Sequence, residues 1–454
     1  MVSIFLYRND VTDTFCNCAN IHTVVSSPQD ALAFQGLFLT ALGLGGIWPC
    51  VPIFGADRFN DTDGADKEPK EIYYNWYYVS VNGGFLFAST VLVWVQDNYG
   101  WGLGFGIPTV FSAVGVAGFL ASMKLYRYQK LGGSALTRIC QVVVAATRKV
   151  NVDLPTDSSL LYEMPGKESV IVGSRKLMHT DELRFLDRAA TITTADEKFL
   201  DTPNPWKLCT VTQVEELNIL TRMLPVFLAA MIFNTAEALF PLFIEQGQVM
   251  DNHIHSFSIP PASLTTFNCL CIVILAPAYN KVLTPIASRF TGVKRGLSEL
   301  QRIGMGIYGF RNAIAAAIVE MARLDMAKKT SLVHQSTVVP MNILWQAPQY
   351  ILVGVAKVFS VVGFIEFAYE QSPDGMKSCC RACVLVMVTL GSYLVSIMLK
   401  MIDSVTEGRG PWLDPENFNQ GRLDLFFWLM AGLQLLNLLG FAYCAMRYKS
   451  KLAR

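Results

Sequence analysis

Residues 343–367, ILWQAPQYILVGVAKVFSVVGFIEF, form one apolar run in which only Lys357 and Glu366 are charged. A helix of about 20 mainly apolar residues is long enough to cross the hydrocarbon core of a bilayer. Eight other apolar runs, separated by polar or charged segments, cover residues 31–53, 73–96, 102–125, 217–244, 261–283, 303–322, 380–402 and 423–446. The sequence therefore predicts an all-α membrane protein with about nine transmembrane helices.

The composition of the whole chain agrees with a lipid environment. Hydrophobic residues make up 52% and charged residues 16% of the 454 residues, which is more apolar than ordinary soluble domains. The net charge of +1 shows no nucleic-acid footprint. We find no nucleophile elbow and no phosphate loop, and neither Cys16 with Cys18 nor His253 with His255 has enough partners for a metal site. We therefore predict no enzyme activity, no cofactor, no metal and no nucleic-acid partner.

A long polar segment at residues 126–216 separates three apolar runs from six. We expect short amphipathic helices near residues 134–149 and 181–190, with disorder between them. Lys and Arg are more frequent on the side of the membrane where this segment lies, so the positive-inside rule places it in the cytosol. The predicted divisions are an unmatched N-terminal segment (1–29), three helices (30–125), a cytoplasmic linker (126–216), six helices (217–447) and a cytoplasmic tail (448–454).

Eight short motifs follow one another along the chain. They are ALGLGGI (41–47), FGADRF (54–59), YNWYYVSVNGG (74–84), LYRYQK (125–130), TVTQVEE (210–216), IPPASL (259–264), ELQR (299–302) and EFAYEQSP (366–373). In this order they resemble the proton-coupled oligopeptide transporter family, in its plant branch of peptide and nitrate carriers. The resemblance implies a major-facilitator fold, in which two six-helix bundles enclose a central cavity.

On this scheme the chain would hold a partial N-terminal bundle and a complete C-terminal bundle. The first three helices of the family, including a Glu-x-x-Glu-Arg motif, have no counterpart in residues 1–29. An incomplete gene model or a degenerate paralogue is the explanation that we favour. The alternative is a true nine-helix protein with another role.

The resemblance also implies a function. It is proton-coupled symport of di- and tripeptides, or of a related small solute such as nitrate, across the plasma or vacuolar membrane of a plant cell. The partners would then be protons, a small solute and the lipid bilayer. The alternative is a transport-inactive truncated paralogue that binds or regulates a full-length relative, which would add a membrane-protein partner.

Ionisable side chains within apolar runs are candidates for function, because an unpaired charge is costly in a membrane. Glu237 and Lys357 lie near the middle of their runs, whereas Lys400 lies near an end and can snorkel to the interface. We hypothesise that Glu237 and Lys357 form a buried ion pair, which would make the central cavity neutral. The alternative is that the two charges occupy separate hydrated pockets.

Four further candidates follow from the resemblance. Trp48 stands where relatives usually carry a lysine on the fourth family helix, and Lys357 stands where they usually carry a glutamate on the tenth. Asn82 and Asn268 match asparagines that contact bound peptide in bacterial relatives, with helix packing as the alternative. Glu366 lies nine residues beyond Lys357, toward the cytosolic end of the same run, and is a candidate gate residue.

Overall fold

The computed structural model describes most of the chain: residues 28–56, 67–126, 133–155, 157–164, 169, 171, 174–193, 196, 204–254, 257–291, 297–307, 309, 311–333, 337–406, 412 and 418–448. The predicted segment 1–29, except for its last two residues, and the tail 448–454, except for its first, lie outside this range, as do Cys16, Cys18 and His255. Two compact units make up the chain. Unit 1 holds residues 1–127, 231–363 and 388–439, and unit 2 holds residues 128–230, 364–387 and 440–454.

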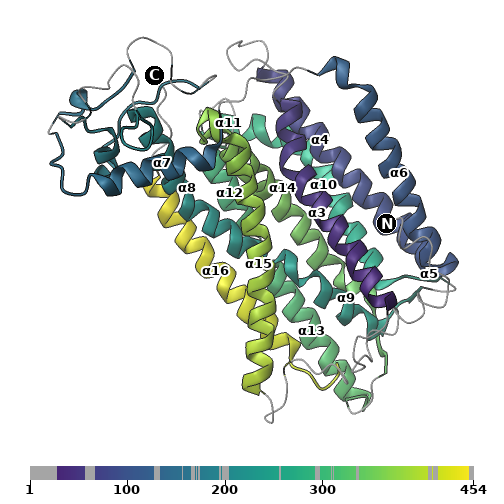
Figure 1. Ribbon diagram of the computed structural model, residues 1–454. Coiled ribbons are helices and arrows are strands. Elements are labelled where there is room, and N and C mark those ends of the chain that lie inside the picture. Colours follow the sequence, from purple (N-terminus) through teal and green to yellow (C-terminus); the bar gives the residue numbers. More distant parts are fainter. Residues whose placement is uncertain are drawn as a thin grey trace. The chain divides into compact units, whose positions relative to one another are not determined.

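Eight helical segments among the described residues are long and apolar enough to cross a membrane. They are Phe34–Pro52, Trp76–Gln96, Gly102–Ala121, Val211–Gln248, Pro261–Arg289, Ile343–Glu370, Asp374–Thr406 and Leu423–Arg447. Each of them overlaps a predicted apolar run. Their helices are α3 (Pro28–Ala56), α4 (Lys67–Phe87), α5 (Val93–Tyr99), α6 (Trp101–Ala121), α8 (Val211–Asn234), α9 (Phe240–Gln248), α10 (Thr265–Ala278), α11 (Thr284–Thr291), α14 (Ala347–Glu370), α15 (Lys377–Thr406) and α16 (Leu423–Arg447) (Figure 1).

The predicted run at residues 303–322 differs from the structure. It is divided between α12 (Glu299–Ile307) and α13 (Arg311–Lys329). Helix α13 is long enough to span a bilayer but carries six charged side chains, so it is not among the eight segments. The described residues thus hold eight such segments, close to the predicted number of about nine, and α13 is the predicted span that is too polar to be counted. The physical reason is the polar composition of α13, whose charged residues Glu320 and Arg323 are fully buried against each other.

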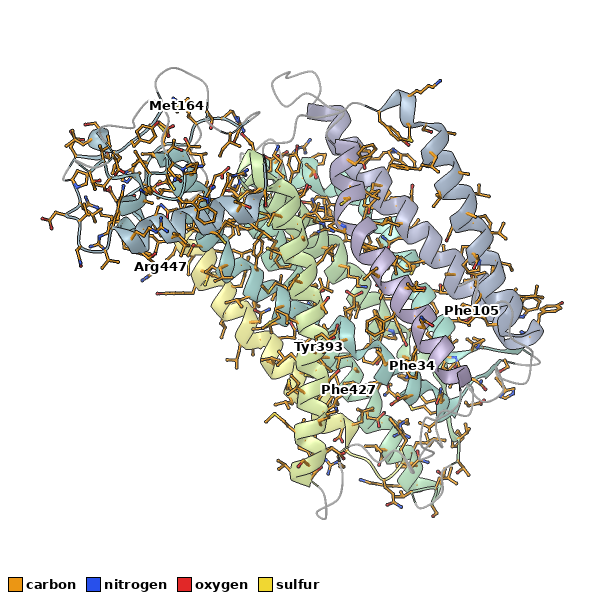
Figure 2. The ribbon with its side chains drawn as sticks, viewed as in Figure 1. Phe34, Phe105, Met164, Tyr393, Phe427 and Arg447 are labelled. Carbon is orange, nitrogen blue, oxygen red and sulfur yellow. The ribbon has the colours of Figure 1, made fainter. Side chains whose placement is uncertain are left out.

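Large apolar side chains cover the outer surfaces of α3 and α6. Phe38 and Leu42 on α3 are 78% and 76% exposed, and Val110 and Phe111 on α6 are exposed as well. Phe34, which Figure 2 labels, belongs to the same α3 surface. Many exposed large apolar side chains are unfavourable in water but stable in lipid. The exposed side chains thus agree with the hydropathy of the sequence.

The core of unit 1 is built on aromatic side chains from α9, α14 and α16. Phe243 lies with its ring centroid 5.6 Å from that of Tyr350 and 5.6 Å from that of Phe427, and all three residues are fully buried. Figure 2 labels Phe427 within this core. Two short sheets belong to the same unit: β1 (Met250–Asp251) pairs in parallel with β4 (Val339–Asn342), and β2 (His253–Ile254) pairs antiparallel with β3 (Phe257–Ser258).

Helix α10 joins the first helices of the chain to the later ones within unit 1. It lies beside α4 (Figure 1), and Ser89, in the π-helical turn η4 (Ala88–Leu92) after α4, shares a hydrogen bond of 3.0 Å with Thr266. On its other side α10 approaches α14 closely, because Gly354 has no side chain: a Cβ there would lie 2.9 Å from the Asn268 carbonyl oxygen. Small residues commonly allow such close approach between membrane helices.

Gly306 allows a second close approach, between α12 and α14. A Cβ at this position would lie 2.5 Å from Ser360 Cβ and still closer to the Ser360 backbone nitrogen. We expect Gly306→Ala to force the two helices apart and to lower the free energy of unfolding by about 1–3 kcal/mol. Thermal unfolding in detergent or nanodiscs measures this loss.

Gly115→Ala on α6 is the matched control, because nothing lies within 4 Å of a Cβ built there. An alanine in a helix is intrinsically more favourable than a glycine by about 0.5–1 kcal/mol. The control should therefore unfold at the same temperature as the wild type or at a higher one. Equal melting temperatures for Gly306→Ala and the wild type would contradict the close packing of α12 and α14.

Unit 2 contains the described residues of the predicted linker, except Tyr126. Helix α7 (Ala135–Arg148) begins after Ser134, whose side chain accepts a hydrogen bond from the Thr137 backbone N–H, and confirms the helix predicted near residues 134–149. The segment predicted near residues 181–190 is helical but forms a 3₁₀ helix, η7 (Arg184–Ala190). A short 3₁₀ turn, η6 (Ser158–Leu160), lies between them.

The described part of the linker has its own hydrophobic core. Leu161, Tyr162 and Leu177 lie between the two predicted helices and are buried, so the prediction of disorder is wrong for these residues. Val142 from α7, Leu186 and Ala189 from η7, and Val214 from the start of α8 are buried together. Arg138 Nε also donates to Glu216 Oε2 at 3.0 Å, and both side chains are buried. Charged residues such as Arg138 and Glu216 can be buried here because they pair with each other. A hydropathy pattern does not reveal such pairs.

Candidate functional site

The candidate site lies where one membrane-crossing segment changes its helical geometry. Helix α8 ends at Asn234, a 3₁₀ turn, η9 (Glu237–Leu239), follows, and α9 begins at Phe240. Pro241 at the start of α9 explains this change, because a proline has no N–H to donate and its ring clashes with the carbonyl of residue 237 in a continuous α-helix. Glu237 therefore lies at an interruption of the segment.

Gln434 on α16 stabilises this interruption. Its Nε2 donates to the Ile232 carbonyl oxygen at 2.7 Å and to Thr235 Oγ1 at 2.8 Å. Backbone carbonyls that lose their helical partners must be satisfied inside a membrane protein, since lipid offers no hydrogen bond. The Thr235 backbone N–H also donates to the Ile232 carbonyl, at 3.1 Å, so Gln434, which is 1% exposed, adds an interhelical donor to this turn.

Lys357 on α14 contacts Glu237 directly. Lys357 Nζ donates to Glu237 Oε1 at 2.7 Å, which is the contact that the sequence predicts. The lysine side chain is 12% exposed and the glutamate side chain is 41% exposed, so only the lysine is nearly buried. Lys357 Nζ also lies 5.1 Å from the centroid of the Phe240 ring, within the range of a cation–π interaction. Both charges are thus compensated inside unit 1.

A small cavity of about 10 Å³ adjoins this ion pair. Its lining residues come from four segments: Phe233, Ala236, Glu237, Gly309, Asn312, Val353, Ala356, Lys357 and Gln434. This volume corresponds to about one water molecule. The ion pair, two amides and apolar walls therefore surround a minimal space, while the Glu237 side chain remains 41% exposed.

The structure does not bring the other predicted binding residues into this cavity lining. Trp48 is partly exposed on α3, with its ring centroid 6.3 Å from that of Phe85. Asn82 is buried, and its Nδ2 donates to the Tyr78 carbonyl oxygen at 2.8 Å in the same helix. Asn268 is buried on α10 at the close contact with α14, and its Oδ1 has no hydrogen-bond partner among the described residues.

Glu366, the candidate gate residue, is half-buried on α14. Two polar residues of the cavity lining were not predicted: Asn312 and Gln434, each 1% exposed. The prediction considered ionisable residues in the apolar runs and Asn82 and Asn268 from the resemblance. A search for Asn and Gln residues in the apolar runs would have found Asn312 and Gln434, because amides inside a membrane also need hydrogen-bond partners.

Comparisons with known proteins identify the family of the chain. A family model described as PTR2, POT family, matches residues 14–413. The chain belongs to the POT family. Protein NRT1/PTR FAMILY 8.3 of Arabidopsis thaliana is 48% identical over 429 residues, which cover 94% of this chain and 73% of that protein. Protein NRT1/PTR FAMILY 3.1 of the same plant is 38% identical over 443 residues, covering 96% of this chain and 74% of that protein.

Two solved structures of POT family members show the same fold. An autoinhibited POT family peptide transporter has a TM-score of 0.60 at 20% identity and covers 93% of this chain and 79% of its own. The POT family transporter PepTSo has a TM-score of 0.58 at 21% identity and covers 98% and 82%. The fold is thus a major-facilitator-type helical bundle of an integral, multi-pass membrane protein, and family and fold are those of transporters rather than enzymes.

Proposed function

We propose that this POT family member is a proton-coupled symporter of di- and tripeptides, or of a related small solute such as nitrate. The observation that carries the proposal is the ion pair between Glu237 and Lys357 at an interrupted helix. Interrupted helices and paired ionisable side chains near the middle of a membrane helix are common features of substrate and ion pathways in transporters.

The ion pair offers a route for coupling. When Glu237 accepts a proton, its carboxylate loses the negative charge that compensates Lys357. The ammonium group of Lys357 then becomes available to an anion, such as a peptide carboxylate or nitrate. Loss of the proton on the other side of the membrane restores the pair and releases the anion. Proton and solute would therefore move together.

Several sequence predictions remain parts of this proposal. Trp48, Asn82 and Asn268 are proposed to contact substrate in a more open form, in which the small cavity has widened, and Glu366 is proposed to act at a gate. Residues 30–125 and 217–447 are proposed to form the partial and the complete bundle on either side of a cytoplasmic linker at 126–216. The membrane is proposed to be the plasma or vacuolar membrane of a plant cell.

Uptake into proteoliposomes tests the function. We expect the purified chain to accumulate a radiolabelled dipeptide or labelled nitrate when the outside is more acidic than the inside, and to lose this accumulation when a protonophore removes the gradient. Empty liposomes provide the background. Correct reconstitution without uptake of either solute would contradict the proposal and would favour a transport-inactive protein that acts on a full-length relative.

A further inference from the structure

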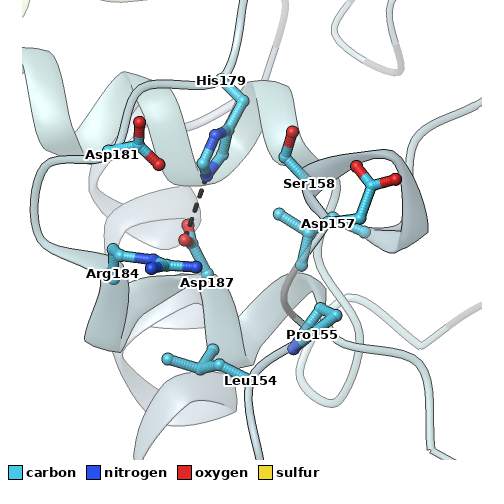
Figure 3. A pocket seen from close by; sticks show the side chains of 9 residues that line it. Leu154, Pro155, Asp157, Ser158, His179, Asp181, Arg184 and Asp187 are labelled. Carbon is cyan, nitrogen blue, oxygen red and sulfur yellow. Dashed lines mark hydrogen bonds and ion pairs between the residues drawn. The ribbon is translucent and has the colours of Figure 1, made fainter.

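A second cavity lies in unit 2, within the predicted linker (Figure 3). Its volume is about 210 Å³, far larger than the space beside Glu237 and Lys357. Its lining residues are Leu154, Pro155, Asp157, Ser158, Leu161, His179, Asp181, Arg184 and Asp187. The transport proposal assigns no role to this cavity, and none of its lining residues belongs to a membrane-crossing segment.

The inner wall of the cavity combines an apolar surface with one buried carboxylate. Asp187 is 4% exposed, and its Oδ2 lies 3.0 Å from His179 Nε2. Its Oδ1 has no hydrogen-bond partner among the described residues. Figure 3 shows this carboxylate turned toward His179, on the cavity side of η7. A buried carboxylate oxygen without a donor is unfavourable, so a ligand that supplies a donor would be stabilised there.

The charges around the cavity favour a cation as this ligand. Asp157 and Asp181 are exposed carboxylates at its rim, and with Asp187 they outnumber the one guanidinium, that of Arg184. Burial raises the pKa of the Asp187 carboxyl, and the hydrogen bond to His179 and the positive charge of Arg184 offset this effect only in part. Leu154, Pro155 and Leu161 supply an apolar surface for a short hydrocarbon chain.

We propose that this cavity binds a small organic cation, an ammonium or guanidinium group with a short apolar tail. The cationic head donates to the carboxylate of Asp187 and is attracted by the two carboxylates of the rim. The tail lies against Leu154, Pro155 and Leu161. A charge-assisted hydrogen bond of this kind is roughly twice as strong as a neutral one, which favours a cation over water or a neutral solute.

Calorimetric titration of the full chain in nanodiscs with n-butylguanidinium tests the proposal, with n-butylurea as its neutral analogue of the same shape. We expect saturable binding of n-butylguanidinium only, and about a tenfold higher Kd for Asp187→Asn. The rim double variant, Asp157→Asn with Asp181→Asn, should also weaken binding. It changes only exposed side chains, so it tests the proposal even if Asp187→Asn does not fold. Asp325→Asn, on an exposed part of α13, removes one negative charge elsewhere and should leave Kd unchanged.

Three results would overturn the proposal. The first is the absence of saturable binding, in which case water alone satisfies Asp187. The second is equal binding of n-butylurea. The third is a wild-type Kd in both Asp187→Asn and the rim double variant, together with weaker binding in Glu237→Gln. That pattern would place the cation at the proposed transport site instead, so the two proposals are tested separately.

Discussion

Arg323→Met should lower the free energy of unfolding by about 3–5 kcal/mol, because it leaves the fully buried Glu320 carboxylate without its cation. Arg323 Nη2 lies 2.6 Å from Glu320 Oε1, and Arg323 Nε donates to Glu320 Oε2 at 2.9 Å. Neither side chain is exposed at all. Chemical or thermal unfolding of the purified protein in nanodiscs measures the loss.

The same pair is part of a larger hydrogen-bond network in unit 1. Arg323 Nη1 donates to Asn419 Oδ1 at 2.5 Å, and Gln246 Nε2 donates to Glu320 Oε2 at 2.8 Å. Gln346 Nε2 in turn donates to Gln246 Oε1 at 2.9 Å. The network connects α13 to α9, to the residues before α14 and to those before α16, so its loss removes contacts among several segments.

Lys329→Met provides a matched control on the same helix. Lys329 Nζ and Asp325 form an ion pair one helical turn apart, but their side chains are 70% and 61% exposed. An exposed pair of this kind contributes at most about 0.5 kcal/mol. A loss in Arg323→Met as small as that in Lys329→Met would show that the buried pair does not stabilise the fold.

Lys357→Met should reduce proton-driven uptake by at least about tenfold, which corresponds to about 1.4 kcal/mol. The reason is that Glu237 loses the cation 2.7 Å away, and the anion loses its proposed binding partner. Glu237→Gln should have an effect of similar size, because it removes the proposed proton acceptor. Initial rates of solute uptake, normalised to the amount of reconstituted protein, measure both changes.

The neutral double variant, Glu237→Gln with Lys357→Met, separates coupling from folding. If the two charges form one unit, the double variant should lose less stability than the two single variants added together, yet it should remain inactive in uptake. Additive losses of stability would contradict the pairing, and normal uptake would contradict the coupling role. Lys400→Met on α15 is the control, because this exposed lysine near the end of its helix should be dispensable.

The apolar runs were predictable because a membrane helix must be apolar over a continuous stretch of sequence, so its signal is local. Residues 343–367, for example, correspond to the segment Ile343–Glu370. The contact between Glu237 and Lys357 was also predictable, because two opposite charges in apolar runs lower their cost by pairing. The two helices had to be adjacent for this, and the family resemblance supplied that condition.

Other features depended on residues far apart in the sequence. The interruption at Glu237 depends on Pro241 within its own segment, but the interhelical hydrogen bond at this turn comes from Gln434, about 200 positions later. The order of the linker depends on α7, η7 and the start of α8 burying one another. A scan for apolar runs cannot detect either feature, because each isolated segment is polar or irregular.

The sequence by itself determined that the chain crosses a membrane several times, that its apolar runs contain the charged residues Glu237 and Lys357, and that it resembles a transporter family. Hydropathy and short motifs are sufficient for these conclusions, because they are properties of neighbouring residues. Only the tertiary structure decided that Glu237 and Lys357 enclose a minimal cavity with Asn312 and Gln434, while Trp48, Asn82 and Asn268 lie outside its lining. Which side chains meet is set by how helices distant in the sequence pack against one another.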